Sequence, residues 1–361
     1  MRKRMVAASA FLGVLCMLPV FQRINTPEHV TAEEHGNEND HGKTSESGYV
    51  GIGIDTSLRI EAGSRIAVVS KSDDGQFWDM VKAGMEAAVA DVNEAYGFSK
   101  DDQITMSFEG PSDERDVETQ INTIDAVIAE NPTVLVLSVG DMDSCQPQIE
   151  TAKENGIPVL LFDSSVADTG MVDAYCGTDN KEVGRLGARH MIDALGGNGK
   201  VVVFAPQEKT LSAKDRVDAF LEEIASEKGI QVIDVVYGDQ VEDMGTAMAE
   251  ELTDHPDLSG VFCSNAVTAE QYLNLDKEEN MADPKMIGVD ATSRQQEAVR
   301  SGAEEGIISQ NPYQMGYKTM WMAICASDPG WDEYGLEDML APMWIDASNI
   351  DSEECKEYIY Y

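Results

Sequence analysis

The chain has 361 residues, 66 of them acidic and 26 basic, which gives a formal net charge of −40 at pH 7. The negative electrostatic field of such a charge repels nucleic acid and anionic lipid surfaces, so we expect neither as a partner. Hydrophobic residues make up 42% of the chain, too many for an intrinsically disordered protein and enough for more than one folded lobe.

The first 24 residues have the composition of an export signal or a membrane anchor. A basic start, MRKRM, precedes the apolar stretch VAASAFLGVLCMLPVF. Leu15 stands before Cys16, a poor match to a lipoprotein signal, and no small-x-small cleavage site follows closely. We expect residues 1–24 to stay as an anchor, with cleavage or lipidation of Cys16 as open alternatives. The protein is then exported to the periplasm or the outer face of the cytoplasmic membrane, tethered only by its N-terminus.

Residues 25–62 predict a disordered acidic linker, because they contain almost no large apolar side chains. His29, His35 and His41 fall six apart in this linker, which leaves a weak metal-binding role open beside the simpler interpretation of solvated linker histidines. The other two histidines, His190 and His255, form no cluster, and the scattered cysteines include no CxxC pair. The sequence therefore supports no folded metal site and demands no disulfide. Cys263 lies inside an apolar run and is expected to be a buried small hydrophobe.

Strands and helices alternate from residue 64 onward. The hydrophobic pattern predicts them in turn at 65–70, 77–92, 103–108, 116–132, 133–139, 145–156 and 157–163. In the first helix apolar residues recur every three or four positions, which puts Phe77 on the buried face and Trp78 off it. Near-continuous apolar strands between helices are typical of a parallel sheet covered on both faces.

The same alternation then starts again. Elements are predicted at 181–199, 200–205, 212–229, 230–237, 243–256, 258–265, 285–290 and 306–310. Two successive runs predict an α/β protein with two doubly wound parallel-sheet lobes. Open parallel sheets bind ligands at the carboxyl ends of their strands, so two facing lobes predict a cleft. No strand is followed by a dinucleotide fingerprint or a P-loop, and we expect no cofactor.

Polar and aromatic side chains gather where the apolar strands stop or the following helices begin. They are Gln76, Phe77, Trp78, Asp163, Ser164, Arg216, Asn265, Asp290 and Gln310. Carboxylates accept hydrogen bonds, a guanidinium donates them and amides do both, which suits the hydroxyls of a sugar. Aromatic rings would cover its C–H faces. Any one Asp or Asn here could equally be a helix N-cap, so the repetition carries the prediction.

Residues 64 to about 346 resemble the type I periplasmic sugar-binding proteins, the ribose- and galactose-binding group whose fold lactose-repressor-type regulators share. The motifs that carry the resemblance are DGQFWDMVKAG, NGIPVLLFDSS, GTDNKEVGRLGARHM, SAKDRVDAF, HPDLSGVFCSN, MIGVDAT and GIISQNPYQMGY. The resemblance implies ligand contacts at Phe77, Trp78, Asp163, Arg216, Asn265, Asp290 and Gln310.

Three positions depart from the family pattern. Ser164 stands where ribose binders usually have Arg, Ala266 replaces a frequent Asp, and Ala219 replaces an expected Gly. Without the guanidinium of that Arg, the site can form hydrogen bonds to a different set of ligand hydroxyls. We therefore expect a polyhydroxylated small molecule, a monosaccharide or related polyol, other than ribose.

The resemblance also implies that three crossings join the lobes in a hinge. We place them near Cys176–Gly177, Gln310–Asn311 and Trp344–Ile345. The N-terminal lobe then comprises residues 64–176 and 311–344, and the C-terminal lobe comprises residues 177–310 and 345–361. Closure around the ligand would remove water from the polar contacts and create a surface that a membrane partner recognises.

The leading functional hypothesis is a monomeric solute receptor that delivers sugar to the permease of an ABC importer. The alternative is a tethered sensor that reports the sugar to a membrane kinase or chemoreceptor. A glycosidase could use Asp163 and Asp290 as its carboxylate pair, but carboxylates in a saccharide site are expected for binding alone, so we predict no enzyme. An apolar start in place of a helix-turn-helix disfavours a transcription regulator.

Overall fold

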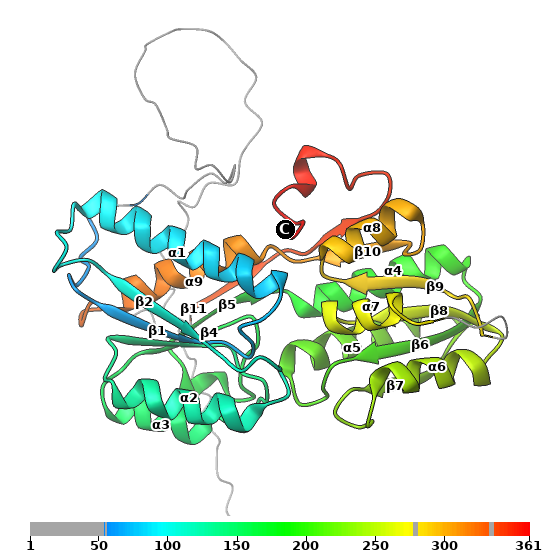
Figure 1. The fold of residues 1–361 in the computed structure, drawn as a ribbon, viewed down its shortest axis with the longest axis horizontal. Helices are drawn as coiled ribbons and strands as arrows, with labels where there is room; N and C mark the ends of the chain where they lie inside the picture. The colour runs from blue at the N-terminus through cyan, green and yellow to red at the C-terminus, as the bar shows by residue number, and fades with distance from the viewer. Residues whose placement is uncertain (1–53, 55, 277–280, 332–335) are drawn as a thin grey trace, which may run out of the picture. The chain divides into compact units, whose positions relative to one another are not determined.

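Two six-stranded sheets with helices on both faces make up the computed structural model, which describes residues 54, 56–276, 281–331 and 336–361 (Figure 1). The predicted anchor and most of the predicted linker lie outside these residues. No helix in the described ranges is long and apolar enough to cross a membrane. The α/β class with two doubly wound lobes is confirmed.

The first sheet has the order β11-β5-β4-β3-β1-β2, and all its pairs are parallel. Its strands are β1 Arg65–Val69, β2 Thr105–Glu109, β3 Val134–Leu137, β4 Val159–Phe162, β5 Ala174–Thr178 and β11 Leu336–Leu340. Four helices cover it, α1 Gln76–Tyr96, α2 Val117–Ala129, α3 Gln146–Glu154 and α9 Pro312–Ala326. One apolar cluster lies under α1 and α9, and a second lies on the opposite face with α2 and α3.

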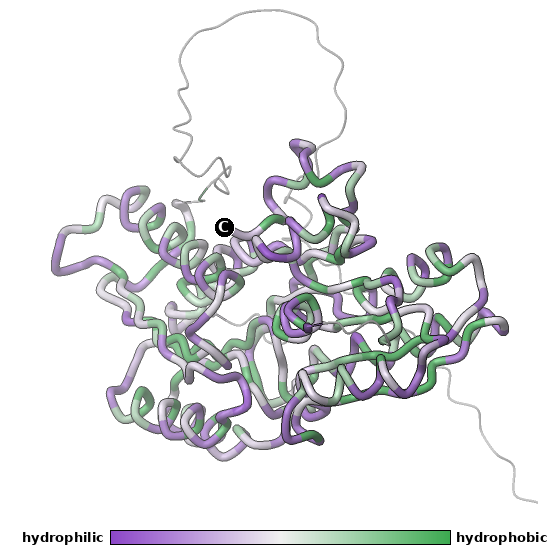
Figure 2. Tube along the Cα trace, turned by 45° about the vertical axis from the view of Figure 1, so that its right-hand side comes forward, coloured by the Kyte–Doolittle hydropathy of each residue, from purple (hydrophilic) through white to green (hydrophobic). Residues whose placement is uncertain are grey.

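The second sheet repeats this plan in the order β12-β10-β9-β8-β6-β7, with only β12 antiparallel among its described pairs. Its strands are β6 Gly199–Ala205, β7 Ile230–Tyr237, β8 Leu258–Cys263, β9 Lys285–Val289, β10 Gly306–Ser309 and β12 Met343–Ile345. Its helices are α4 Asn180–Leu195, α5 Leu211–Ile224, α6 Met244–Asp254, α7 Ala266–Leu273 and α8 Ser293–Ser301. Hydrophobic and hydrophilic stretches alternate along the trace of both lobes (Figure 2).

Cysteine burial follows the sequence prediction. Cys263 is fully buried in the second lobe, as expected. Within the described part of the chain no disulfide joins any cysteines.

The described chain passes between the sheets three times, and the third passage lies apart from its predicted place. Cys176 and Gly177 both lie inside β5, so the first crossing follows Thr178. The second lies between β10 and α9, at Gln310–Asn311. Trp344 pairs with Ile308 in the second sheet, so the third crossing comes earlier, between Leu340 and Met343. The third crossing was misplaced because β12, an antiparallel edge strand of three residues, is too short to show a clear hydrophobic period.

The predicted linker also ends earlier than expected, because its last residues pack on the first lobe. Ile60 contacts the apolar cluster under α1. The hydroxyl of Tyr96 donates to the Leu58 carbonyl at 2.8 Å. The folded part of the chain thus begins before residue 64.

Helices α1 and α9 cross closely because two glycines face the opposite backbone. A Cβ on Gly84 would collide with the Tyr313 carbonyl, and a Cβ on Gly316 would collide with the Val81 carbonyl. Through this contact a late segment of the chain completes the core of the first lobe.

We predict that Gly316→Ala lowers the free energy of unfolding by about 2 kcal/mol, the cost of overpacking a close backbone contact. Urea denaturation measures the change. Gly330→Ala is the matched control, because a Cβ there would meet its nearest atom, Asp328 Oδ1, at an ordinary 3.4 Å. Equal stability of the two variants would contradict the proposed role of the α1–α9 contact.

Candidate functional site

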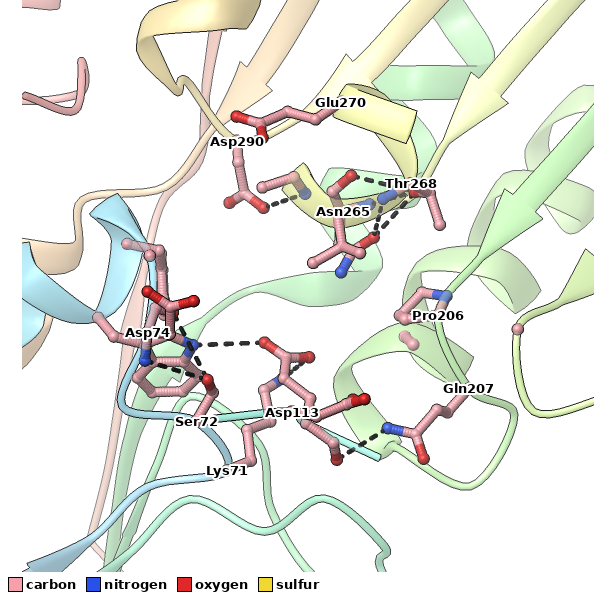
Figure 3. Close-up of a pocket in the computed structure, with 18 of the residues that line it drawn as sticks. Lys71, Ser72, Asp74, Asp113, Pro206, Gln207, Asn265, Thr268, Glu270 and Asp290 are labelled. Atoms are coloured by element: carbon pink, nitrogen blue, oxygen red, sulfur yellow. Dashed lines mark hydrogen bonds and ion pairs between the residues drawn. The ribbon is translucent and has the colours of Figure 1, made fainter. Parts of the chain in front are cut away.

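A cavity of about 630 Å³ lies where the carboxyl ends of the two sheets face each other. This volume falls within the range typical of small-molecule sites, about 300–1,000 Å³. Eight of the nine predicted residues line it, namely Gln76, Phe77, Trp78, Asp163, Arg216, Asn265, Asp290 and Gln310. Figure 3 shows Asp290 and Asn265 across the cavity from Lys71 and Ser72.

Two carboxylates occupy equivalent places in the two lobes. Asp163 directly follows β4 and Asp290 directly follows β9, and both have a left-handed backbone, with φ of 55° and 81°. Asp tolerates this conformation better than most residues. Each backbone N–H donates at 3.0 Å to the neighbouring strand, to the Cys176 and Ile308 carbonyls respectively. Residues held in such conformations cluster at functional sites.

The Asp163 carboxylate is half engaged by protein donors. Its Oδ2 accepts from Ser138 Oγ and pairs with Lys71 Nζ, both at 3.0 Å. Both contacts are made by Oδ2, and no donor among the described residues reaches Oδ1. Oδ1 can therefore accept from a ligand hydroxyl.

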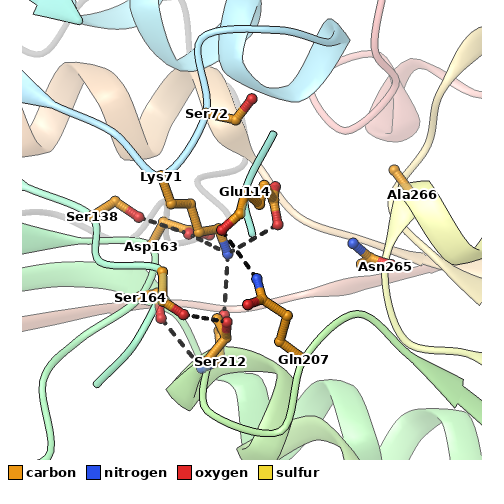
Figure 4. A network of polar contacts seen from close by, with 12 residues as sticks. Lys71, Ser72, Glu114, Ser138, Asp163, Ser164, Gln207, Ser212, Asn265 and Ala266 are labelled. Carbon is orange, nitrogen blue, oxygen red and sulfur yellow. Dashed lines mark hydrogen bonds and ion pairs between the residues drawn. The ribbon is translucent and has the colours of Figure 1, made fainter. Parts of the chain in front are cut away.

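Lys71 is the centre of a polar network that joins the two lobes (Figure 4). Its ammonium lies 3.9 Å from Glu114 Oε2 and 3.5 Å from Ser212 Oγ of the second lobe. Burial alone would lower the pKa of Lys71, but the carboxylates of Asp163 and Glu114 outweigh it, and the pKa is raised. Lys71 is thus a fixed cation.

The Asp290 carboxylate is held by uncharged donors only. Gln310 Nε2 and the hydroxyl of Tyr360 both donate to Oδ1, at 2.7 and 3.0 Å. The backbone N–H of Ala266 donates to Oδ2 at 2.8 Å. Because a carboxylate offers about four acceptor sites, one on Oδ2 is left for a ligand.

Two further side chains offer donors to the cavity. Asn265 Oδ1 accepts from Thr268 in a capping box at the start of α7, so only its amide NH₂ is available. Figure 4 shows this nitrogen directed towards the Lys71 network. Arg216 is 4% exposed and donates to Asn180 Oδ1 and the Ser264 carbonyl, at 2.7 and 2.9 Å. Its other N–H groups face no carboxylate within the described ranges.

The roles predicted for the aromatic pair are reversed. Trp78 is only 3% exposed and packs edge-on against Phe162, while its indole N–H donates to Glu114 Oε1 at 3.3 Å. Phe77 is half-buried at the cavity wall and lies 6.0 Å from the Tyr360 ring. Both residues stand in the first turn of α1, where the helical period does not decide which side faces the core.

Two other predicted contacts differ from expectation. Ser164 does not line the cavity, since it is buried behind Asp163 and accepts from the Ser212 backbone N–H at 3.5 Å. Gln76 lines the cavity, but its amide both accepts from and donates to Ser293 of the second lobe, at 2.8 and 2.9 Å. Gln76 therefore ties the lobes together.

A second group of contacts ties the lobes on the other side of the cavity. The Met142 N–H donates to the Lys209 carbonyl at 3.0 Å, and Thr210 Oγ1 donates to the Gly140 carbonyl at 2.6 Å. Gln207 Nε2 donates to the Glu114 carbonyl at 3.1 Å. The described protein is thus in a closed arrangement.

Among the described residues, no three or more His, Cys, Asp or Glu side chains are grouped so that they could hold a metal ion.

Comparison with known proteins identifies the family. The model described as "Periplasmic binding protein domain" matches residues 66–328. The chain belongs to the periplasmic binding protein family. The resemblance to type I sugar-binding members, predicted from the sequence, is confirmed.

Its relatives include named sugar binders. The binding protein is 27% identical over 191 residues to the ribose import binding protein of Salmonella typhimurium, covering 53% of this chain and 64% of that one. It is 24% identical over 240 residues to the D-apiose import binding protein of Paraburkholderia graminis, covering 66% of this chain and 73% of that one. The match thus spans less than two thirds of the length of the ribose relative.

Among solved structures, an ABC transporter solute binding protein from Agrobacterium vitis with bound D-fucose has a TM-score of 0.74. It is 27% identical, and the match covers 82% of this chain and 100% of that one.

Sequence analysis named none of Lys71, Glu114, Gln207 and Tyr360 as a ligand contact. Lys71 stands among the polar residues that follow the first predicted strand, but the resemblance gave it no role in binding. The other three stand in loops or in the C-terminal segment, where no pattern marks them.

We predict that Lys71→Met lowers the free energy of unfolding by about 3 kcal/mol, because it leaves the buried Asp163 carboxylate without its cation. Lys285→Met is the control, since the Lys285–Glu305 pair is exposed and should contribute less than about 1 kcal/mol. Urea denaturation of both variants checks this, and a smaller loss for Lys71→Met than for the control would contradict it.

Glu114 should make the protein less stable as the pH rises above 4.5. Burial raises the pKa of Glu114 more than Lys71 lowers it, so the folded state holds a proton that the unfolded chain has released. Glu114→Gln should flatten this part of the profile of unfolding free energy against pH.

The control for Glu114 has the opposite sign. A hydrogen bond from Arg115 lowers the pKa of Asp113, so its stabilisation is lost as the pH falls through 3.8 and below. Asp113→Asn should remove that slope and leave the Glu114 slope unchanged. A Glu114→Gln profile identical to that of the parent would show the inferred proton to be absent.

Proposed function

We propose that this protein captures a neutral monosaccharide or related polyol in the interlobe cavity and delivers it to an ABC importer. The observation that carries the proposal is the set of unfilled hydrogen-bonding positions around one cavity. Asp163 and Asp290 each keep an acceptor, whereas Asn265 and Arg216 keep donors. A polyol both donates and accepts, so it matches such a mixed set.

The charge of the cavity favours an uncharged ligand over an anion. Its lining carboxylates are Asp74, Asp113, Glu114, Asp163, Glu270 and Asp290, against the cations Lys71, Arg115 and Arg216. Two of the cations, Lys71 and Arg115, already pair with carboxylates of the lining. A ligand carboxylate or phosphate would enter a region of excess negative charge.

The names of the relatives support the importer over the sensor. Two of the relatives are named as import binding proteins for ribose and D-apiose, and the A. vitis protein holds D-fucose. We infer an exported, non-catalytic receptor held near the membrane by its N-terminal segment. Export, the tether and the monomeric state are proposals, as is the use of Gln76, Phe77, Arg216 and Gln310 in binding.

A thermal-shift screen of the full chain tests the binding proposal. The panel contains D-ribose, D-allose, D-arabinose, D-fucose, D-tagatose and D-apiose. A sugar present at one hundred times its Kd should stabilise the folded state by about 2.7 kcal/mol. With D-sorbitol and D-xylitol added to the panel, no shift with any of these sugars or polyols would contradict the proposal.

Site variants tie the shift to the cavity. Arg216→Ala and Asp290→Ala should each abolish the sugar-dependent gain, compared with the ligand-free melting temperature of the same variant. Lys214→Ala is the matched control, because Lys214 lies on the same helix but is exposed and pairs with Asp218. Loss of radiolabelled sugar uptake on deletion of the protein distinguishes the importer from the sensor, which would leave uptake intact.

A further inference from the structure

The C-terminal segment, residues 346–361, returns from β12 to the edge of the cavity. It buries Ile350, Cys355 and Tyr360 in the second lobe, with Tyr360 only 1% exposed, whereas the next residue, Tyr361, is 65% exposed. Figure 1 shows the C-terminus between α1 of the first lobe and α8 of the second. The segment therefore buries one particular tyrosine beside the site.

Hydrogen bonds fix the backbone of this segment at the ends of two strands. The Tyr360 N–H donates to the Ala291 carbonyl at 3.0 Å, and Gln296 Nε2 donates to the Tyr360 carbonyl at 2.7 Å. Ser309 Oγ donates to the Tyr358 carbonyl. Ala291 follows Asp290, and Ser309 precedes Gln310, so the anchor points adjoin two cavity residues.

The phenol of Tyr360 is aimed at the cavity carboxylate. It donates to Asp290 Oδ1, the oxygen that also accepts from Gln310. Burial, and next the Asp290 charge, raise the pKa of Tyr360 well above its ordinary value, so the hydroxyl keeps its proton at neutral pH. With Oδ1 occupied by two donors, only Oδ2 can accept from a ligand.

The Tyr360 ring also contacts the opposite lobe. Its centroid lies 6.0 Å from that of Phe77, at an interplanar angle of 57°. Phe77 lines the cavity and belongs to α1, whereas Tyr360 is anchored to the second lobe. The ring contact therefore forms only when the lobes approach, next to the carboxylate that the phenol holds.

We propose that Tyr360 is a positioning residue that sets sugar selectivity, because it occupies Asp290 Oδ1 and so directs Oδ2 at a single ligand hydroxyl. This inference rests on the proposed sugar binding. A segment that only covered the sheet end would be served as well by phenylalanine. The hydroxyl is what the positioning role requires.

The test uses Tyr360→Phe in the full chain and sugars that differ by one hydroxyl. Two pairs are D-ribose with 2-deoxy-D-ribose and D-galactose with D-fucose. In the remaining pairs D-glucose is compared in turn with 1,5-anhydro-D-glucitol and with 2-, 3-, 4- and 6-deoxy-D-glucose. Calorimetry gives the discrimination within each pair. Tyr360→Phe should reduce it about tenfold in one pair, the same pair that Asp290→Asn affects, and leave the other pairs unchanged.

Tyr358→Phe is the matched control, because this tyrosine lies on the same segment and its hydroxyl makes only a 3.5 Å contact with the Ala341 carbonyl. It should change no pair. If Tyr360→Phe proves too unstable to measure, Gln296→Leu replaces it. Losing the hydrogen bond to the Tyr360 carbonyl releases the backbone that aims the phenol at Asp290, so discrimination should fall in the same pair.

The outcomes separate this inference from the proposed function. Failure of the unaltered chain to bind every parent sugar contradicts the proposed function. If a parent sugar binds, unchanged discrimination in Tyr360→Phe overturns the positioning role. A uniform loss of affinity for all sugars overturns it too, because that result would mean that the segment supports only the fold.

Discussion

The partial occupation of two carboxylates by protein donors is the constraint on which the rest of the site depends. Asp163 uses Oδ2 for Ser138 and Lys71, and Asp290 uses Oδ1 for Gln310 and Tyr360. What each carboxylate has left, rather than its mere presence, determines what the cavity can accept. Each can take a hydroxyl from one direction, so the cavity is complementary to a rigid polyol with hydroxyls at fixed separations.

The hinge is joined to the site by one side chain. Gln310, at the second crossing, accepts from Thr178 Oγ1 at the first crossing and donates to Asp290. The Asp179 N–H donates to the Leu340 carbonyl, which links the first crossing to the third. A change of hinge angle would therefore alter the Asp290 carboxylate directly. Ligand binding at Asp290 can in turn favour the closed arrangement, because the hydrogen bond from Gln310 joins this carboxylate to the hinge.

The sequence was informative where its pattern follows from sheet geometry. Apolar strands between helices predicted both sheets, and the carboxyl-end rule found Asp163, Asp290 and Gln310 because strand ends of a parallel sheet meet at one edge. Asn265 shows that two explanations of one residue can both hold. It caps α7 with its oxygen and presents its nitrogen to the cavity.

The remaining features depend on contacts between distant parts of the chain. Phe77 and Trp78 exchanged roles because the partners of Trp78, Phe162 and Glu114, come from two other loops and strands. Ser164 was included by its position next to Asp163, yet its hydroxyl accepts from the Ser212 backbone N–H of the second lobe and does not line the cavity. Tyr360 follows no periodic element, so no local signal could connect it with Asp290.

The two lobes share a backbone plan but differ in the charge around their carboxylates. Asp163 and Asp290 follow corresponding strands, with the same left-handed conformation and the same backbone bond to the next strand. In the first lobe a buried ammonium balances the carboxylate, while in the second only neutral donors hold it. The acceptor on Asp290 is therefore the more negative of the two, and hydrogen bonds to it gain more. A sugar whose most acidic hydroxyl faces Asp290 is favoured over the reversed orientation, so the asymmetry gives a pseudo-symmetric cleft one preferred direction of binding.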